Sequence, residues 1–127
     1  MMAPDPESTC DLLRGLRVLI VEDEPMLASS LEDALTDLGC VVIGPALNMT
    51  DALRLAREAE MDGASLDVNI AGEKVYAVAD ILTARGIPFV FMTGYGKAGL
   101  RESDLGRPVL QKPCNLNRFL EIVRGWR

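Results

Sequence analysis

Residues 17–25 of this chain read RVLIVEDEP, an apolar run that ends in three consecutive acidic residues. Three further short apolar runs end in a polar residue as well, namely Asp67, Thr93 and Lys112. In a parallel sheet all strands end at one edge, and open α/β folds place their functional sites there. If the four runs are parallel strands, carboxylates, a hydroxyl and an ammonium group meet at that edge.

Helical periodicity separates these runs. Apolar residues recur at spacings of three and four, and Pro25 stands where a first-turn proline is favoured. Asn48 and Asn115 have the side chain and the position of N-caps. The predicted strands cover about residues 17–21, 40–43, 64–67, 89–93 and 109–111. The predicted helices cover about residues 27–38, 52–59, 75–82 and 116–123.

Strands that alternate with helices indicate a doubly wound parallel sheet with helices on both faces. Five strands suit the flavodoxin-like order 2-1-3-4-5, with the switch point between the first and third strands. Residues 94–107 contain four glycines and little apolar periodicity. For this stretch we expect a short irregular helix or a mobile loop.

The length of 127 residues predicts one folded domain, which we place at residues 15–127 after a flexible or partly helical lead-in over residues 1–14. The lead-in lacks the features of a secretory signal, and no apolar run approaches the ~18 residues that suggest a membrane span. With no CxxC spacing, the three cysteines predict free thiols in a reducing cytoplasm.

Charge and composition exclude several function classes. The net charge of −6 disfavours direct binding to DNA, which needs a basic surface. The sequence contains no histidine, and this removes Ser-His-Asp triads and His-ligated zinc.

Glu22, Asp23 and Asp67 together predict a cation site. Two like charges about 4 Å apart repel by roughly 4 kcal/mol at an effective dielectric constant of 20, so three clustered carboxylates require a cation. Oxygen ligands with open positions suit Mg²⁺, and Lys112 can neutralise the cluster when the metal is absent. Each residue alone has an ordinary alternative: acids at a helix N-terminus, a strand-end hydroxyl at Thr93, or a solvated lysine. The occurrence of all of these residues at strand ends in one sequence is far more specific for a functional site than any one of them.

Four stretches resemble the response-regulator receiver domain, in order and over nearly the whole chain from Gly15. They are VLIVEDEP (18–25), LDVN (66–69), FMTG (91–94) and QKP (111–113). The resemblance implies that Asp67 is the phosphoacceptor and that Thr93 and Lys112 bind the phosphoryl oxygens.

For the metal, the resemblance implies that Asp23 binds Mg²⁺ directly and that Glu22 binds it through water. Asp67 and the Asn69 backbone carbonyl would complete the protein ligands. Asn69 and Tyr95 also occupy positions that tune the lifetime of the acyl phosphate in the family.

Three positions depart from the family pattern. Val109 replaces the usual Tyr or Phe of the switch, and Ala71 replaces the usual proline four residues after the phosphoacceptor. The stretch PFVFMTGYG (88–96) resembles the "FAT GUY" subgroup of stand-alone receivers, which lacks that aromatic residue, with Met92 in place of its usual alanine. Tyr95 is a candidate substitute for the missing aromatic side chain, and an ordinary loop tyrosine is the alternative.

We therefore expect a single-domain response regulator of a phosphorelay, not an enzyme. Its expected partners are a sensor histidine kinase or histidine phosphotransfer protein and an unidentified downstream protein. With no output domain expected after Trp126, it would signal through protein contacts or act as a phosphate sink. One alternative is a receiver-like adaptor that is not phosphorylated. The other is a small phosphatase with an aspartyl nucleophile, although Asn69 stands where such enzymes carry a second aspartate.

Overall fold

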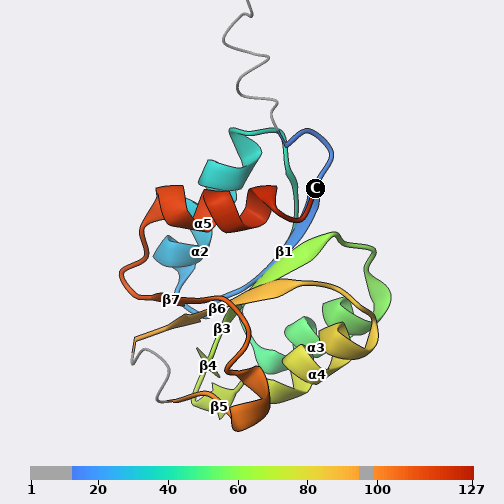
Figure 1. The fold of residues 1–127 in the computed structure, drawn as a ribbon, viewed down its shortest axis with the longest axis vertical. Helices are drawn as coiled ribbons and strands as arrows, with labels where there is room; N and C mark the ends of the chain where they lie inside the picture. Colours follow the sequence, from blue (N-terminus) through green and yellow to red (C-terminus); the bar gives the residue numbers. More distant parts are fainter. Residues whose placement is uncertain (1–12, 95–98) are drawn as a thin grey trace, which may run out of the picture.

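A computed structural model describes residues 13–94 and 99–127, and its centre is a five-stranded parallel sheet. The strands lie in the order β2-β1-β3-β6-β7 (Figure 1). Their bounds are β1 Arg17–Val21, β2 Val41–Ala46, β3 Gly63–Asp67, β6 Phe89–Thr93 and β7 Val109–Gln111. This is the predicted order 2-1-3-4-5, and the predicted fold class is confirmed.

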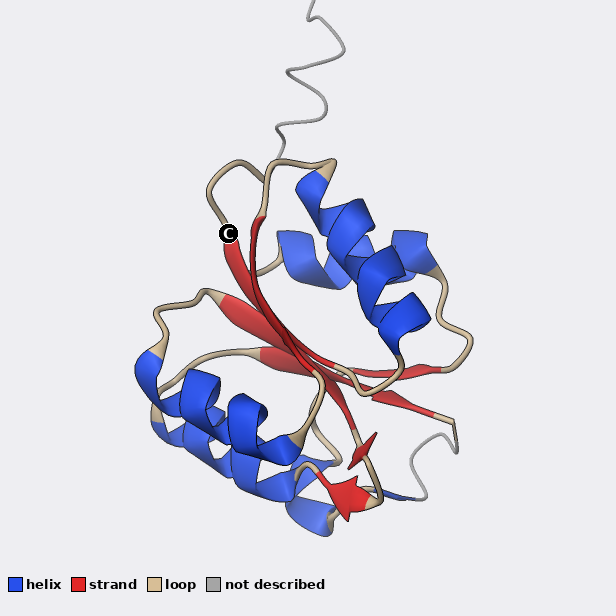
Figure 2. Ribbon diagram, turned by 180° about the vertical axis from the view of Figure 1, so that it is seen from behind, coloured by secondary structure: helices blue, strands red, loops and turns tan. Residues whose placement is uncertain are grey.

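Helices cover both faces of the sheet. They are α2 Pro25–Thr36, α3 Met49–Glu58, α4 Tyr76–Ala84 and α5 Leu116–Arg124. Helices α2 and α5 lie on one face, and α3 and α4 lie on the other (Figures 1 and 2). Both predicted asparagine caps form: Asn48 Oδ1 accepts the Asp51 N–H at 2.8 Å, and Asn115 Oδ1 accepts the Asn117 N–H at 2.9 Å.

Alternation along β1 explains the two layers. Successive strand residues point to opposite faces, so Val18 and Ile20 join the core under α2 and α5. Leu19 and Val21 join the core against α3 and α4. All four side chains are at most 1% exposed, as expected for a strand covered on both faces. The apolar run therefore fixes β1 in the sheet and delivers Glu22 and Asp23 to its carboxyl edge.

Several predicted boundaries differ from those in the structure by a few residues. Strand β2 runs to Ala46 instead of ending at Ile43, and it includes Gly44 and Pro45. Proline is tolerated there because β2 is an edge strand, where a missing N–H costs no ladder bond. Helix α2 ends at Thr36, before the Leu38 that its periodicity had included.

A two-stranded antiparallel hairpin follows the central strand and was not predicted. It consists of β4 (Asn69–Ile70) and β5 (Glu73–Lys74). It lies between β3 and the start of α4 in the chain and extends from the carboxyl edge of the sheet. Strands of two residues are too short to leave a hydrophobic alternation in the sequence.

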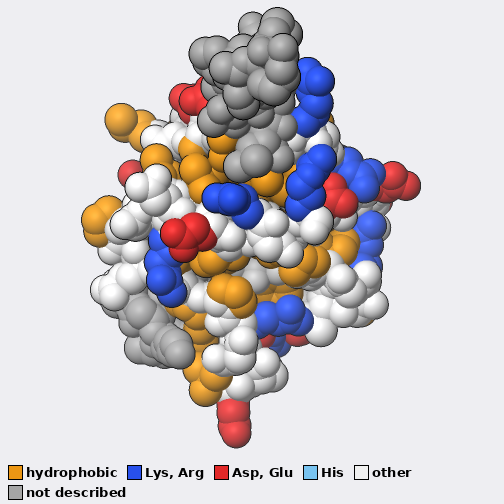
Figure 3. Space-filling view, turned by 45° about the horizontal axis from the view of Figure 1, so that its top comes forward, with side chains coloured by type: hydrophobic (Ala, Val, Ile, Leu, Met, Phe, Trp, Pro, Cys, Tyr) orange, Lys and Arg blue, Asp and Glu red, His pale blue; other side chains and the backbone are white. Residues whose placement is uncertain are grey.

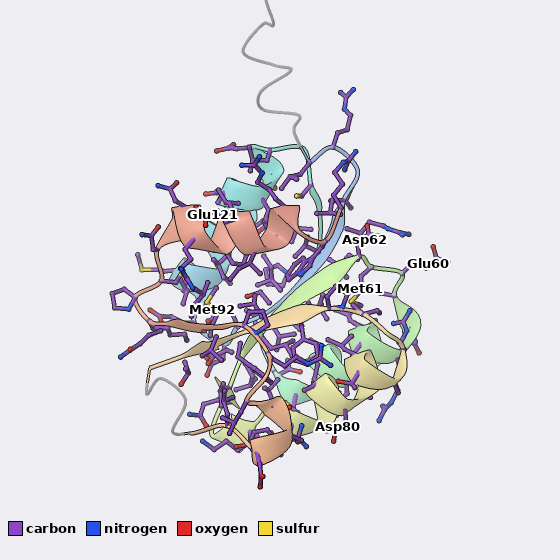
Figure 4. All side chains as sticks on the ribbon, in the orientation of Figure 1. Glu60, Met61, Asp62, Asp80, Met92 and Glu121 are labelled. Carbon is purple, nitrogen blue, oxygen red and sulfur yellow. The ribbon has the colours of Figure 1, made fainter. Side chains whose placement is uncertain are left out.

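Between β6 and β7, the described part of the chain includes a short 3₁₀ helix, η2 (Glu102–Asp104). Arg101 fastens this stretch to α4. Its Nη2 lies 2.9 Å from Asp80 Oδ1, its Nε lies 2.8 Å from Asp104 Oδ2, and its guanidinium carbon lies 4.6 Å from the ring centroid of Tyr76. Figure 4 labels Asp80 on α4. The attachment is thus largely polar.

At the amino end of β3, a close contact ties the C-terminus to the sheet. A Cβ added to Gly63 would lie 2.1 Å from Trp126 Cε3, so no larger residue fits there without displacing the indole. Nearby, Asp62 Oδ2 accepts the Arg17 backbone N–H at 2.8 Å, and Figure 4 labels Asp62 at this end of the molecule. None of the helices in the described residues is long and apolar enough to cross a bilayer.

Candidate functional site

The strand ends bring the predicted carboxylates together. Glu22 and Asp23 follow β1, and Asp67 is the last residue of the neighbouring strand β3. One carboxylate oxygen from each of these residues lies within 4.8 Å of the other two. Glu22 and Asp67 are buried, and Asp23 is half-buried. The edge of the sheet therefore gathers three acids within reach of a single cation.

Lys112 bridges two of these acids. Its Nζ lies 2.9 Å from Asp67 Oδ2 and 3.0 Å from Glu22 Oε1. Burial lowers the pKa of Lys112, but the hydrogen bonds and charges of Asp67 and Glu22 outweigh burial and raise that pKa above its ordinary value. The lysine is therefore charged at neutral pH and neutralises part of the cluster.

Backbone pairing fixes Lys112 beside Thr93. The Lys112 N–H donates to the Thr93 carbonyl at 2.8 Å, and Thr93 pairs with Gln111 in the β6–β7 register. Thr93 is 2% exposed at the end of β6. The structure thus brings Thr93 and Lys112, from adjacent strands, to the edge that carries the acids.

The ionised form of the Glu22 carboxyl group is disfavoured by its surroundings. Burial is the main cause that raises its pKa to about 7, the nearby charge of Asp67 adds to the effect, and the Glu24 N–H and Lys112 oppose it. Although Lys112 Nζ is close to Oε1, the hydrogen-bond geometry is met at Oε2, at 3.3 Å. Among the described residues, Oε1 is the buried side-chain oxygen that lacks a hydrogen bond.

Asp23 takes its hydrogen bond from the unpredicted hairpin. Its Oδ2 accepts the Ala71 N–H at 2.8 Å. Burial alone would raise the pKa of Asp23, but hydrogen bonds, with that of Ala71 foremost, outweigh it and hold the pKa below its ordinary value. Asp23 is therefore an ionised carboxylate at neutral pH. A backbone N–H carries no residue-type signal, so sequence reasoning had no means of finding this contact.

The donor set fits a hard divalent cation. Three carboxylates supply oxygen ligands, and Glu22 Oε1, which faces Lys112 but accepts no hydrogen bond, provides a buried lone pair that a cation or its bound water can satisfy. Asn69, a predicted carbonyl ligand, begins β4, and its N–H donates to Asp67 Oδ1 at 3.2 Å. The residues present therefore fit Mg²⁺, and Asp23, Asp67 and Glu22 are the residues that would bind it.

Two other predicted positions lie away from the acids or outside the described residues. Val109 begins β7, is half-buried, and packs against the core beneath α3 and α4. An aliphatic side chain therefore occupies the position at which the resemblance leads us to expect the aromatic residue of the switch. Tyr95, the candidate substitute, lies outside the described residues, as do residues 1–12 of the lead-in that was predicted over residues 1–14.

A groove of about 450 Å³ lies beside the site, between the start of α2 and the turn from β7 into α5. Leu27, Cys114 and Leu116 supply apolar lining, and Glu24 and Lys112 line it as well. Leu116 is 40% exposed. On the face shown in Figure 3, basic side chains are interspersed with acidic and hydrophobic ones.

Comparison with known proteins identifies one family. The model of the response regulator receiver domain matches residues 18–124. The chain is 38% identical over 81 residues to the phyllosphere-induced regulator PhyR of Methylorubrum extorquens, an alignment that covers 61% of this chain and 30% of PhyR. Other curated relatives are also longer, and the chain spans 49 to 60% of their lengths.

Solved structures give the same fold. The solution structure of SdrG from Sphingomonas melonis Fr1 is 39% identical, with a TM-score of 0.77, over 88% of this chain and 96% of SdrG. The receiver domain of the sensor histidine kinase PA1611 from Pseudomonas aeruginosa PAO1 is 23% identical, with a TM-score of 0.72, over 88% of this chain and 97% of that one. The crystal structure of that receiver holds a magnesium ion in its active-site cleft.

Proposed function

The chain belongs to the response regulator receiver domain family, and from that premise we propose that Asp67 accepts a phosphoryl group from a phosphohistidine. Receiver domains act in two-component signalling as phosphoacceptors and are not classical enzymes. The observation that carries the proposal is the contact of Lys112 with Asp67 and Glu22, beside Asp23, at the carboxyl edge of the sheet.

In the proposed reaction a carboxylate oxygen of Asp67 attacks phosphorus. The new O–P bond forms as the P–N bond to the donor imidazole breaks, and that imidazole takes up a proton. Among the described residues, each Asp67 oxygen has one hydrogen-bond partner, Asn69 for Oδ1 and Lys112 for Oδ2, and this leaves a second lone pair for the attack.

Electrostatic stabilisation accounts for the transfer in this proposal. Asp23, Asp67 and Glu22 would hold Mg²⁺, which when bound would neutralise negative charge on the transferred phosphoryl oxygens. Lys112 and Thr93 bind the same oxygens. Catalysis by positioning and charge requires no general base, in keeping with a chain that lacks histidine. Water later hydrolyses the acyl phosphate.

We further propose that the partners are proteins and that the chain works in the cytoplasm. The phosphodonor is a sensor histidine kinase or a histidine phosphotransfer protein. The signal passes to a downstream protein, or the chain serves as a phosphate sink. The face expected to change comprises β6, the stretch over residues 94–107 and α5, since these elements adjoin Thr93 and Lys112.

Intact mass spectrometry tests the phosphoacceptor. Incubation with Mg²⁺ and a small phosphoramidate or acyl phosphate is expected to give one labile phosphoryl adduct. Asp67→Asn is expected to give none, and Asp33→Asn, a matched change at an exposed carboxylate of α2, to retain it. Absence of an adduct with every donor and metal would favour an adaptor, and turnover of a generic phosphate ester would favour a phosphatase.

A further inference from the structure

The turn of the β4–β5 hairpin has an uncommon backbone conformation. Ile70 pairs with Glu73, so Ala71 and Gly72 form a two-residue turn. Their φ angles are +50° and +85°, the signs required by a type I′ turn. A positive φ costs glycine nothing but is uncommon for any other residue, and among the described residues Ala71 alone adopts it without being glycine.

This conformation directs the Ala71 N–H at Asp23. The N–H donates to Asp23 Oδ2 at 2.8 Å, although 48 positions separate the two residues in sequence. Proline at this position would lack the N–H, and its ring would exclude a φ of +50°. The departure from the family's usual proline is therefore what makes the contact possible.

The hairpin holds its turn firmly relative to Asp67. The Asn69 N–H donates to Asp67 Oδ1 at 3.2 Å, and the Val75 N–H donates to the Val68 carbonyl at 2.9 Å. Ile70 is fully buried in the core against α3 and α4. One short element therefore contacts the carboxylates of both Asp67 and Asp23.

We propose that Ala71 is a positioning residue for the cation site: its N–H orients the Asp23 carboxylate before the cation arrives. Lys112 orients the carboxylates of Glu22 and Asp67, and the hairpin orients the carboxylate of Asp23. A carboxylate that accepts one N–H keeps further lone pairs for a metal, so the bond persists when the cation binds. The inference rests on the proposed function in taking Mg²⁺ as the cation.

Replacing the Ala71 amide by an ester tests the proposal, with lactic acid in place of alanine at this position. The change removes the N–H and keeps the methyl group. Calorimetric titration with MgCl₂ is expected to show roughly three- to tenfold weaker binding, the cost of ordering one side chain on binding. Ala71→Gly, which keeps the N–H and tolerates the positive φ, is expected to bind Mg²⁺ within about twofold of the wild type.

A second readout separates this role from a purely structural one. At saturating Mg²⁺ the ester protein is expected to form the phosphoryl adduct in wild-type yield, since only cation affinity is impaired. Equal or tighter Mg²⁺ binding by the folded ester protein would overturn the proposal, whether or not an adduct forms. If affinity falls as expected but even the wild type forms no adduct, the positioning role stands and the proposed function fails.

Discussion

Glu22 carries its carboxylate where water is excluded, and this has a cost that depends on pH. Its pKa in the folded chain is raised to about 7, from 4.5 for the ordinary group. A raised carboxyl pKa means that the folded state holds the proton more tightly, so stability falls as pH rises from about 4.5 to about 7 and is level above that range. The cation proposed for this site would relieve the penalty.

Glu22→Gln is accordingly expected to stabilise the metal-free protein at pH 8, by about 1 to 3 kcal/mol, and to change little at pH 4. Urea unfolding followed by circular dichroism in EDTA, at several pH values, measures this. The wild type should lose stability across the interval from pH 4.5 to 7 relative to the variant. Parallel pH profiles for the two proteins would contradict the assignment of the shift to Glu22.

At this scale, residue type and position made the acids, Thr93 and Lys112 predictable. A polar residue that ends a buried run has to face the strand edge, and the structure brings these side chains there. Their roles in phosphotransfer stay predictions. The Ala71 contact could not be predicted, since its donor is an N–H that every residue except proline carries.

Among the elements, the strands flanked by helices were the most predictable. The bounds of β1, β6 and β7 match the predicted residues 17–21, 89–93 and 109–111. Each is a short apolar run between clear boundaries. The edge strand β2 was misjudged because glycine and proline usually end a strand, and an edge tolerates both. The β4–β5 hairpin left no periodicity to detect.

Ion pairs and hydrogen bonds of two arginines connect the stretch between β6 and β7 to α4. Arg101 joins it to Asp80 on α4 and stacks over Tyr76, and Arg107 Nη2 donates to Thr83 Oγ1 at 2.9 Å. Among the described residues of this stretch, Leu100 is the one that packs against a hydrophobic core cluster. With little apolar burial, local opening of this stretch should cost much less than global unfolding.

Arg101→Gln is expected to increase amide hydrogen exchange over residues 99–107 about tenfold, with the strands unaffected, because opening then lacks its main polar restraint. Mass-spectrometric exchange with peptide resolution measures this. Arg118→Gln, at an exposed arginine of α5, is the matched control and should leave exchange in the stretch unchanged. Unchanged exchange in Arg101→Gln would show that other contacts hold the stretch in place.

For the whole molecule, two helix layers enclose a sheet whose ends serve different purposes. The strand order was predictable because alternating strands and helices leave few topologies for five strands. The carboxyl edge carries the acids, and the amino edge carries the packing of the C-terminus onto Gly63. This second feature was not predictable, since a glycine at the start of a strand has many explanations.

Gly63→Ala is expected to destabilise the protein by about 1 to 3 kcal/mol, since the added methyl group must displace the Trp126 ring. Urea unfolding gives the free energy. Gly106→Ala, where an added Cβ meets nothing within 4 Å, is the matched control and should stay near the wild type. Equal stability of both variants would mean that the ring moves aside at no cost.

The position of Trp126 also determines what the intrinsic fluorescence of this protein can report. It is the single tryptophan, and it packs at Gly63, whereas Asp67 stands at the other end of the same strand, about 13 Å away at 3.3 Å per residue. Intrinsic fluorescence will therefore report the melting of the sheet but stay silent on Mg²⁺ at the acids. An optical assay of the loaded site needs a fluorophore introduced at the carboxyl edge.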